Sequence, residues 1–238
     1  MYPPQNIGIG GIVNTYHLDD GAITLDDLRK RLETTDLIPS RVSLLEGIHE
    51  HFARLRDSGI LTLADLREAV KSKKALQVLS VKTGIEREYL TLLRREIEGY
   101  FPKPLPVASF NWIPQQVLIA FKNNGMADTK AIVEQLSEKR HRTAFGLTAG
   151  IAPVLVETVF CLSGLTRIQW TSPAVARMLL AAGYRTVAQV ASADPDMLYR
   201  DLDRVNREQK IFKGTIGSRD VRRLIRAAKT LVQLPQSA

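Results

Sequence analysis

The sequence predicts an all-α fold assembled from repeated helical units, and three observations lead to that prediction. The chain has 238 residues, of which 45% are hydrophobic and only 6% aromatic. Leu, Ala, Arg, Lys and Glu dominate its middle, and these residues favour helices over sheets. A turn phrase that contains glycine recurs three times. The length and hydrophobic content allow a sizeable core, in one large or two small domains.

The expected elements begin after an N-terminal tail over residues 1–19. The tail contains two prolines and the run Gly8-Ile9-Gly10-Gly11, without helical periodicity, so we expect it to be flexible. These glycines do not form a phosphate-binding loop, because no Lys-Ser/Thr pair, preceding strand or following helix completes the motif. Helical signals start at Thr24, which with Asp27 is expected to cap a helix that runs through Glu33.

The turn phrase consists of a helix end, a glycine, an apolar residue and then a threonine before the next helix. It occurs over residues 58–66, 124–132 and 182–190. Glycine adopts the left-handed conformation that ends one helix, and threonine caps the next. We therefore expect the same helix-turn-helix device at three places.

A second phrase supports the repeat. Thr83-Gly84-Ile85 returns as Ala149-Gly150-Ile151, 66 residues later, and Gly59 and Gly125 are also 66 residues apart. Two independent markers with one offset indicate duplication. The third turn follows after only 58 residues, at Gly183.

The prolines between the first two copies predict a domain boundary. Residues 101–109 begin with Phe-Pro-Lys-Pro-Leu-Pro, which suits neither a helix interior nor a central strand. We expect two helical lobes joined by this linker: an N-terminal domain over 20–100 and a basic C-terminal domain over 110–238.

The net charge of +8 is unevenly distributed. Residues 1–100 hold 14 Lys and Arg against 15 Asp and Glu, whereas residues 101–238 hold 19 against 10. Most of the excess lies between Arg204 and Lys229, where nine basic residues accompany two acidic ones. Such a segment is a candidate contact for an anionic partner, although a solvated polar face is the alternative.

A short apolar hinge and a helix precede each turn phrase. The hinges are Leu45-Glu46-Gly47-Ile48-His49, Asn111-Trp112-Ile113-Pro114 and the run from Leu165 to Pro173. This pattern, strongest over 165–230, resembles the helix-hairpin-helix superfamily and, more narrowly, the bacterial proteins grouped as domain of unknown function 4332. The resemblance covers about residues 20–232, and the narrower family has no established activity to transfer.

In helix-hairpin-helix modules the hairpin reads apolar-x-Gly-apolar-Gly, and its backbone N–H groups bind a DNA or RNA phosphate without reading bases. This sequence departs from that pattern in every copy. Gly47 matches the first glycine, but His49 replaces the second. Trp112 and Pro114 occupy the two places in the second copy, and Trp170 and Ser172 occupy them in the third. The two tryptophans are expected to anchor the core rather than to stack on bases.

The third hairpin is the best candidate for a phosphate contact. Thr171 and Ser172 lead into Pro173, a favourable helix start, and Arg177 follows about one turn later. The C-terminal segment offers a second route, because Ser218 as an N-cap would present free N–H groups near Lys213. The candidate residues of this second route are Lys210, Lys213, Gly217, Ser218, Arg219, Arg222, Arg223 and Arg226.

Catalytic and metal sites find little support. Glu46 and His49 have the spacing of a ligand pair, but no third or fourth ligand accompanies them. The only cysteine, Cys161, lies in an apolar run and is expected to be a buried, inert thiol. We therefore expect no enzyme activity, no cofactor, no metal and no small-molecule substrate.

No segment reaches the ~18 apolar residues that a membrane span requires, and no targeting signal is evident. We expect a bacterial cytoplasmic protein without a membrane partner. The leading functional hypothesis is sequence-nonspecific binding to DNA or RNA through backbone phosphates. The alternative is a protein-protein interaction scaffold built on the same repeats.

Overall fold

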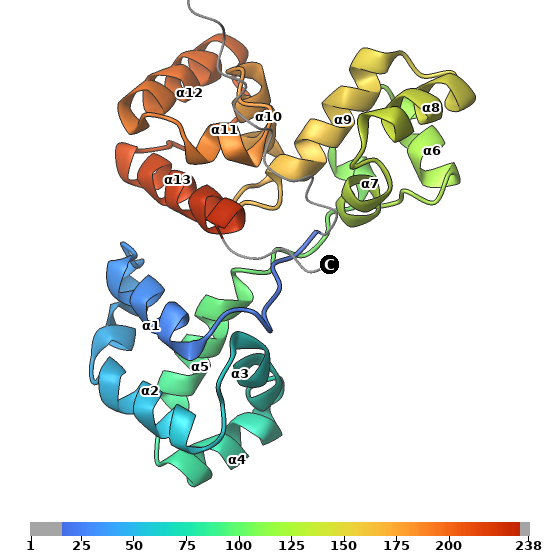
Figure 1. Cartoon of the computed structure of the whole chain (residues 1–238). Coiled ribbons are helices and arrows are strands. Elements are labelled where there is room, and N and C mark those ends of the chain that lie inside the picture. Colours follow the sequence, from blue (N-terminus) through green and yellow to red (C-terminus); the bar gives the residue numbers. More distant parts are fainter. Residues whose placement is uncertain (1–15, 234–238) are drawn as a thin grey trace, which may run out of the picture.

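The computed structural model describes residues 16–233, and every named element in that range is a helix. The all-α prediction is confirmed, since the only β-type contacts there are two isolated bridges. Figure 1 shows three groups of helices: an N-terminal, a middle and a C-terminal group. A single hydrophobic cluster of buried residues extends from Leu18 to Leu231 and so includes side chains of all three groups.

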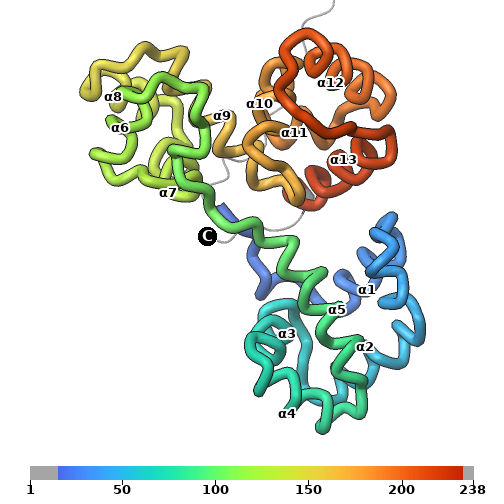
Figure 2. Tube along the Cα trace, turned by 180° about the vertical axis from the view of Figure 1, so that it is seen from behind, coloured from blue at the N-terminus to red at the C-terminus, as the bar shows by residue number. Residues whose placement is uncertain are grey.

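The N-terminal group contains α1 (Leu25–Thr34), η1 (Pro39–Leu45), α2 (Ile48–Asp57), α3 (Leu63–Ala69), α4 (Lys73–Thr83) and α5 (Arg87–Glu98). The middle group contains η2 (Val107–Ser109), α6 (Gln115–Asn123), α7 (Thr129–Gln135), α8 (Lys139–Ala149) and α9 (Pro153–Leu165). The C-terminal group contains α10 (Pro173–Ala181), α11 (Val187–Ala191), α12 (Pro195–Gln209) and α13 (Ser218–Gln233). Helix α9 packs on α7, α8 and α10 and so joins the last two groups. Figure 2 shows the helix-free segment that carries the chain from α5 to the middle group.

The predicted turn glycines all adopt the left-handed conformation. Gly59, Gly125 and Gly183 have φ values of 91°, 78° and 94°. In each turn the N–H of the following apolar residue donates to the carbonyl five residues back, as Ile60 does to Leu55 at 3.2 Å. These hydrogen bonds satisfy carbonyls that the ending helix leaves free.

The next helix is capped by a side chain in all three turns, with one correction to the sequence expectation. Thr62 and Thr186 are the N-caps of α3 and α11, as expected. In the middle group, however, Asp128 is the cap of α7, and Thr129 lies inside the helix, fully buried. The Asp128 carboxylate accepts the hydrogen bond from the Ala131 N–H. The expected cap on α1 is confirmed, because Thr24 and Asp27 form a reciprocal capping box.

The first two groups share a helix spacing. Helices α3, α4 and α5 begin at residues 63, 73 and 87, and α7, α8 and α9 begin at 129, 139 and 153, which is 66 residues later in each case. Gly84 and Gly150 end α4 and α8 with φ values of 67° and 65°. An equivalent backbone bridge, Thr24 to Thr62 or Pro106 to Asp128, holds a preceding segment against each turn.

A short segment before α1 ties the groups together. Tyr16 and Leu18 are 1% and 4% exposed, and the Tyr16 hydroxyl lies 2.9 Å from the Thr129 hydroxyl in α7. The Tyr16 carbonyl accepts a hydrogen bond from Nε of Arg167. The last residues of the segment expected to be a flexible tail are therefore part of the fold. Residues 1–15, including the glycine run, lie outside the described residues.

Candidate functional site

Three arginines of α13 contact the C-terminal end of α1 and the residues that follow it. Arg219 donates two hydrogen bonds to the Asp36 carboxylate, at 2.6 and 2.5 Å. Arg223 donates to the carbonyls of Asp36 and Leu37, at 2.9 and 3.1 Å, and Arg226 donates to the carbonyl of Thr34. Cations are stabilised at this place because helix C-termini present free carbonyls and a negative dipole end. Three of the predicted phosphate ligands thus join the N-terminal and C-terminal groups.

The electrostatics of this contact are centred on Asp36. The hydrogen bond from Arg219 lowers the pKa of Asp36 from 3.8 to about 2, with a further contribution from the positive charge of Arg223. The same carboxylate raises the pKa of Arg219. Asp36 lies two residues after the end of α1, and its negative charge compensates the positive charges of Arg219 and Arg223.

The predicted anion site at the N-terminus of α13 is arranged differently. The helix begins at Ser218, so Ser218 is not its N-cap. The N–H of Gly217 instead donates to the Asp220 carboxylate at 2.9 Å. The sequence analysis expected an external phosphate to accept hydrogen bonds at this helix start. The Asp220 carboxylate of the same helix accepts one of them instead.

Three predicted phosphate ligands are exposed to solvent and have no ion-pair partner among the described residues. Lys210, Lys213 and Arg222 make no ion pair within the part of the chain that the structure describes, and the same holds for Lys229 in the last turns of α13. Lys210 ends α12 in the left-handed conformation, with φ 50°. These four side chains are named the exposed cation set below.

The third hairpin adopts part of the expected geometry. Trp170, which stands at the place of the first hairpin glycine, has φ 67°, and Gly47 at the matching place has φ 59°. Ser172 caps α10 through a hydrogen bond from the Val175 N–H. Pro173 follows at the first helical position and has no N–H, so α10 offers one amide fewer to a phosphate.

The side chains of this hairpin differ in their surroundings. The Arg177 guanidinium lies 5.1 Å from the centre of the Trp112 ring, and the Thr171 hydroxyl is buried without a hydrogen-bond partner among the described residues. Trp112 is partly buried as expected, but Trp170 is 53% exposed, which corrects the expectation that both anchor the core.

The third hairpin also packs on the N-terminal group. Gln169 is 6% exposed and lies 3.5 Å from Nη2 of Arg31. A Cβ atom at Gly99 would lie 2.5 Å from Nε2 of Gln169, so a larger residue at this position would displace the Gln169 amide. Nearby, burial lowers the pKa of Arg167 to about 10. The hairpin region is therefore an internal contact as well as a surface.

Several residues of this interface had no signal in the sequence. Arg219 and Asp36 are separated by 183 residues, and Tyr16 and Arg167 by 151. Tyr100 and Arg31 pack together, with the guanidinium 3.6 Å from the ring centre. Local patterns carry no information on such distant partners, and only the surplus of arginine on α13 hinted at a contact.

The described residues contain no group of three or more potential metal ligands. His49, one of the two residues considered as a ligand pair, instead lies 3.1 Å from Glu33. Cys161 is buried as expected, and burial raises the pKa of its thiol. Within residues 16–233 no helix has both the length and the apolar character that crossing a membrane requires.

Comparisons with known proteins place the C-terminal half of the chain in a family. No curated protein and no solved structure matches the chain. A family model described as "Domain of unknown function (DUF4332)" matches residues 113–231, from the turn before α6 to the last turns of α13. This match covers half of the chain, and the protein therefore belongs to the DUF4332 family.

Proposed function

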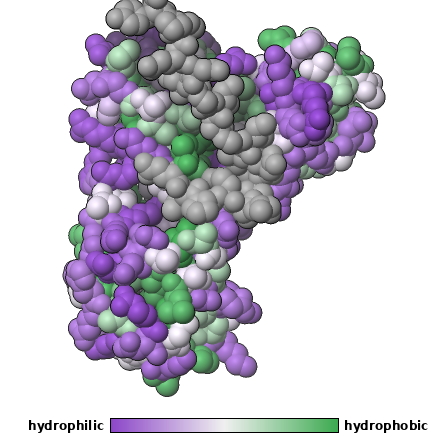
Figure 3. Space-filling model, in the orientation of Figure 1, coloured by the Kyte–Doolittle hydropathy of each residue, from purple (hydrophilic) through white to green (hydrophobic). Residues whose placement is uncertain are grey.

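We propose that this protein is an array of helix-hairpin-helix-like units that binds DNA or RNA phosphates without sequence preference and performs no catalysis. The observation that carries the proposal is the exposed cation set: Lys210, Lys213, Arg222 and Lys229 have no acidic partner among the described residues. Figure 3 adds that the side formed by α12, α13 and α1 is mostly hydrophilic. Such cations neutralise backbone phosphates and release counterions.

The repeat architecture is the second support. The shared offset of 66 residues, the glycine turns and the left-handed hairpin residues Gly47 and Trp170 are consistent with tandem copies of one unit. The proposed phosphate contacts, however, are made by the exposed cation set and not by the hairpins. In the third hairpin the Thr171 and Val175 N–H groups already donate within the protein, and Arg219, Arg223 and Arg226 donate to Asp36 and to carbonyls at the end of α1. The C-terminal group is therefore the proposed binding surface, in a protein that we place in the bacterial cytoplasm.

Charge reversal separates this proposal from a general effect of basicity. Fluorescence anisotropy with labelled duplex and single-stranded DNA and RNA would compare two variants. Lys213→Glu/Arg222→Glu is expected to abolish binding at about 50 mM salt, where phosphate contacts are strong. Lys73→Glu/Lys74→Glu, on exposed residues of α4, makes the same change in net charge and is expected to retain most of the affinity. Equal losses in the two variants would contradict the proposed surface.

A specific observation favours the protein scaffold as a second candidate. The exposed Trp170 ring borders an apolar groove of about 190 Å³ that Ile38, Val175 and Ile216 also line. Aromatic residues beside such grooves are typical anchors of protein contacts. If the scaffold is correct, the full chain retains a stoichiometric protein partner after nuclease treatment. Trp170→Ser then loses the partner, and Leu147→Ser, at another exposed apolar residue, keeps it.

A further inference from the structure

A groove lies on the N-terminal group, between α4, the end of α3 and the turn that precedes α3. It has a volume of about 460 Å³. The buried side chains of Ile60 and Leu79 and the exposed side chain of Val78 line it. Every described residue of its lining belongs to the N-terminal group, so neither of the other two groups fills it. We call it the α4 groove.

Helix α4 exposes apolar side chains at this groove. Val78 is 60% exposed, and Val81, one turn later on the same helix, is 76% exposed. Residues three apart lie on one face of a helix, so the two valines form one apolar patch. Single exposed apolar residues are ordinary on protein surfaces, whereas an apolar patch beside a groove is typical of a surface that binds another molecule.

Positive charge surrounds the apolar patch. Between residues 66 and 83 the chain holds five basic residues and one acidic residue, although residues 1–100 as a whole hold 14 and 15. The acidic residue, Glu68, pairs with Lys71, and Lys73 and Lys74 have no ion pair among the described residues. The lysines that line the groove are Lys71, Lys74 and Lys82. The rim of the groove is therefore complementary to a partner with negative charge.

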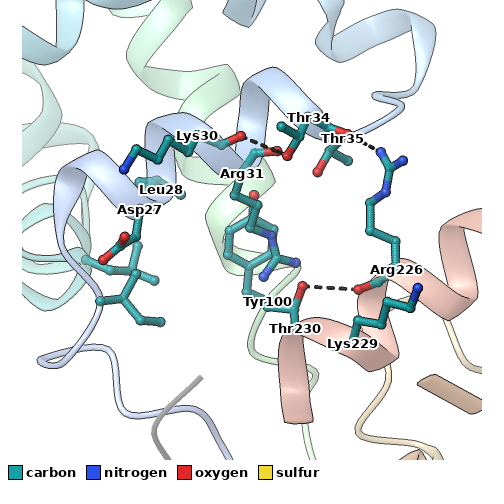
Figure 4. A pocket seen from close by; sticks show the side chains of 12 residues that line it. Asp27, Leu28, Lys30, Arg31, Thr34, Thr35, Tyr100, Arg226, Lys229 and Thr230 are labelled. Carbon is teal, nitrogen blue, oxygen red and sulfur yellow. Dashed lines mark hydrogen bonds between the residues drawn. The ribbon is translucent and has the colours of Figure 1, made fainter. Parts of the chain in front are cut away.

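The side of the N-terminal group that carries α1 already has a partner within the chain. Arg226 of α13 donates to the Thr34 carbonyl at the end of α1 (Figure 4), and Arg219 binds Asp36 nearby. Figures 1 and 2 show α4 at the other end of this group, away from the middle and C-terminal groups. The α4 groove is therefore accessible while the contact between α1 and α13 is in place.

We infer that the α4 groove docks an acidic amphipathic helix of another protein. The apolar face of that helix covers Val78 and enters the groove, and its carboxylates lie near Lys73 and Lys74. An amphipathic helix in a groove is a recurring mode of recognition, in which apolar side chains at i, i+3 or i+4 and i+7 are the anchors. The charged rim rejects basic helices.

The shape of the surface favours a helix over a membrane. A flat anionic bilayer would reach the exposed Val81 and the lysines, but it would leave the concave part of the groove unfilled. An inserted helix covers both the groove and the patch. This inference goes beyond the proposed function and does not depend on it.

Fluorescence anisotropy of the full chain with labelled synthetic peptides tests the partner class. The probe is a peptide of about four helical turns, with leucines on one face and glutamates on both flanks. One control peptide has lysines in place of the glutamates, and the other has serines in place of the leucines. The acidic amphipathic peptide is expected to bind with a dissociation constant below about 1 mM, and each control at least about tenfold more weakly.

Three results of this experiment overturn the inference. The first is no binding of the acidic amphipathic peptide at about 1 mM. The second is equal binding of either control peptide, since charge or apolar contact would then play no part. The third comes from vesicles of phosphatidylcholine and phosphatidylserine: if they bind the chain and the peptide does not, the surface is a membrane contact.

Variants locate the docking surface. Val78→Ser is expected to weaken peptide binding at least about tenfold, whereas Leu147→Ser, at an exposed apolar residue of α8, leaves it unchanged. Lys73→Glu/Lys74→Glu is also expected to weaken it at least about tenfold. Glutamates in the first turn of α4 suit the helix dipole, so this variant retains its fold. Unchanged affinity in Val78→Ser and in the charge variant contradicts the site.

The same charge variants separate this inference from the proposed function. Lys73→Glu/Lys74→Glu is expected to lose the peptide and to keep nucleic acid, and Lys213→Glu/Arg222→Glu is expected to do the reverse. Loss of the peptide in Lys213→Glu/Arg222→Glu would place its site on the C-terminal group and overturn the inference. Failure of nucleic-acid binding in the unmodified chain, with the peptide still bound, would remove only the proposed function.

Discussion

Two neighbouring arginines of α13 are predicted to have opposite roles. Arg223 donates hydrogen bonds to two backbone carbonyls at the end of α1, and its side chain is 13% exposed. Arg222, one residue earlier, is exposed and has no ion pair within residues 16–233. Alanine at these two positions therefore compares the same residue type on one helix. Only Arg223→Ala breaks a contact between the N-terminal and C-terminal groups.

The expected loss of stability differs between the two variants. A hydrogen bond that involves a charged group contributes about 1.5–3 kcal/mol, so Arg223→Ala is expected to cost about 3 kcal/mol or more. Arg222→Ala is a surface change and is expected to stay within about 0.5 kcal/mol. For a chain of this size, about 1 kcal/mol shifts the thermal midpoint by roughly 2–4 °C. The midpoint should fall by roughly 6 °C or more for Arg223→Ala and by less than about 2 °C for Arg222→Ala.

The assay combines thermal unfolding with hydrogen exchange. Because a chain with three helical groups need not unfold in one step, exchange of the α13 amides reports on the local contact. Arg223→Ala should accelerate exchange in α13 and at the end of α1, and Arg223→Lys should not restore it, since lysine lacks the planar fork that reaches both carbonyls. The affinity for nucleic acid should show the opposite pattern: it should fall more for Arg222→Ala than for Arg223→Ala. Equal stabilities for the two alanine variants would refute the assigned roles.

Three further predictions concern single residues. Because the pKa of Asp36 is lowered from 3.8 to about 2 in the folded protein, its charged form favours folding above about pH 4, and this contribution is lost as pH falls towards 2. The thermal midpoint of Asp36→Asn at low salt should therefore change less than that of the wild type over this range; parallel curves would argue against the contact. Burial raises the pKa of the Cys161 thiol, so a thiol reagent should label it only after unfolding, and rapid labelling of the native protein would contradict this. Trp170→Gly relieves a left-handed backbone at an exposed side chain and should leave the unfolding free energy unchanged or raise it by up to about 1 kcal/mol, whereas a clear loss would mean that the ring stabilises the fold.

The local part of the fold could be read from the sequence. The capping box of Thr24 and Asp27 and the left-handed turns at Gly59, Gly125 and Gly183 depend on residues within one or two turns of each other, so their chemistry is visible in the residue order. The N-cap of α7 is the exception. Asp128 caps α7 where Thr129 was expected, because Thr129 is buried against Tyr16.

The candidate site could be read only in part. The basic character of α13 was evident, but which of its arginines face solvent depends on α1, far away in sequence. The anion site expected at the start of α13 also differs from the prediction, because the Asp220 carboxylate of the same helix accepts the hydrogen bond from the Gly217 N–H. Tertiary packing decides such features, and it overrides the local pattern.

The salt dependence of duplex DNA binding by the unmodified full chain tests the proposed surface most directly. Each phosphate neutralised contributes about −0.9 to the slope of log affinity against log salt. The exposed cation set, Lys210, Lys213, Arg222 and Lys229, therefore predicts a slope of about −3 to −4 between about 50 and 200 mM salt. A flat slope over that range, or no binding at its lower end, would contradict the account.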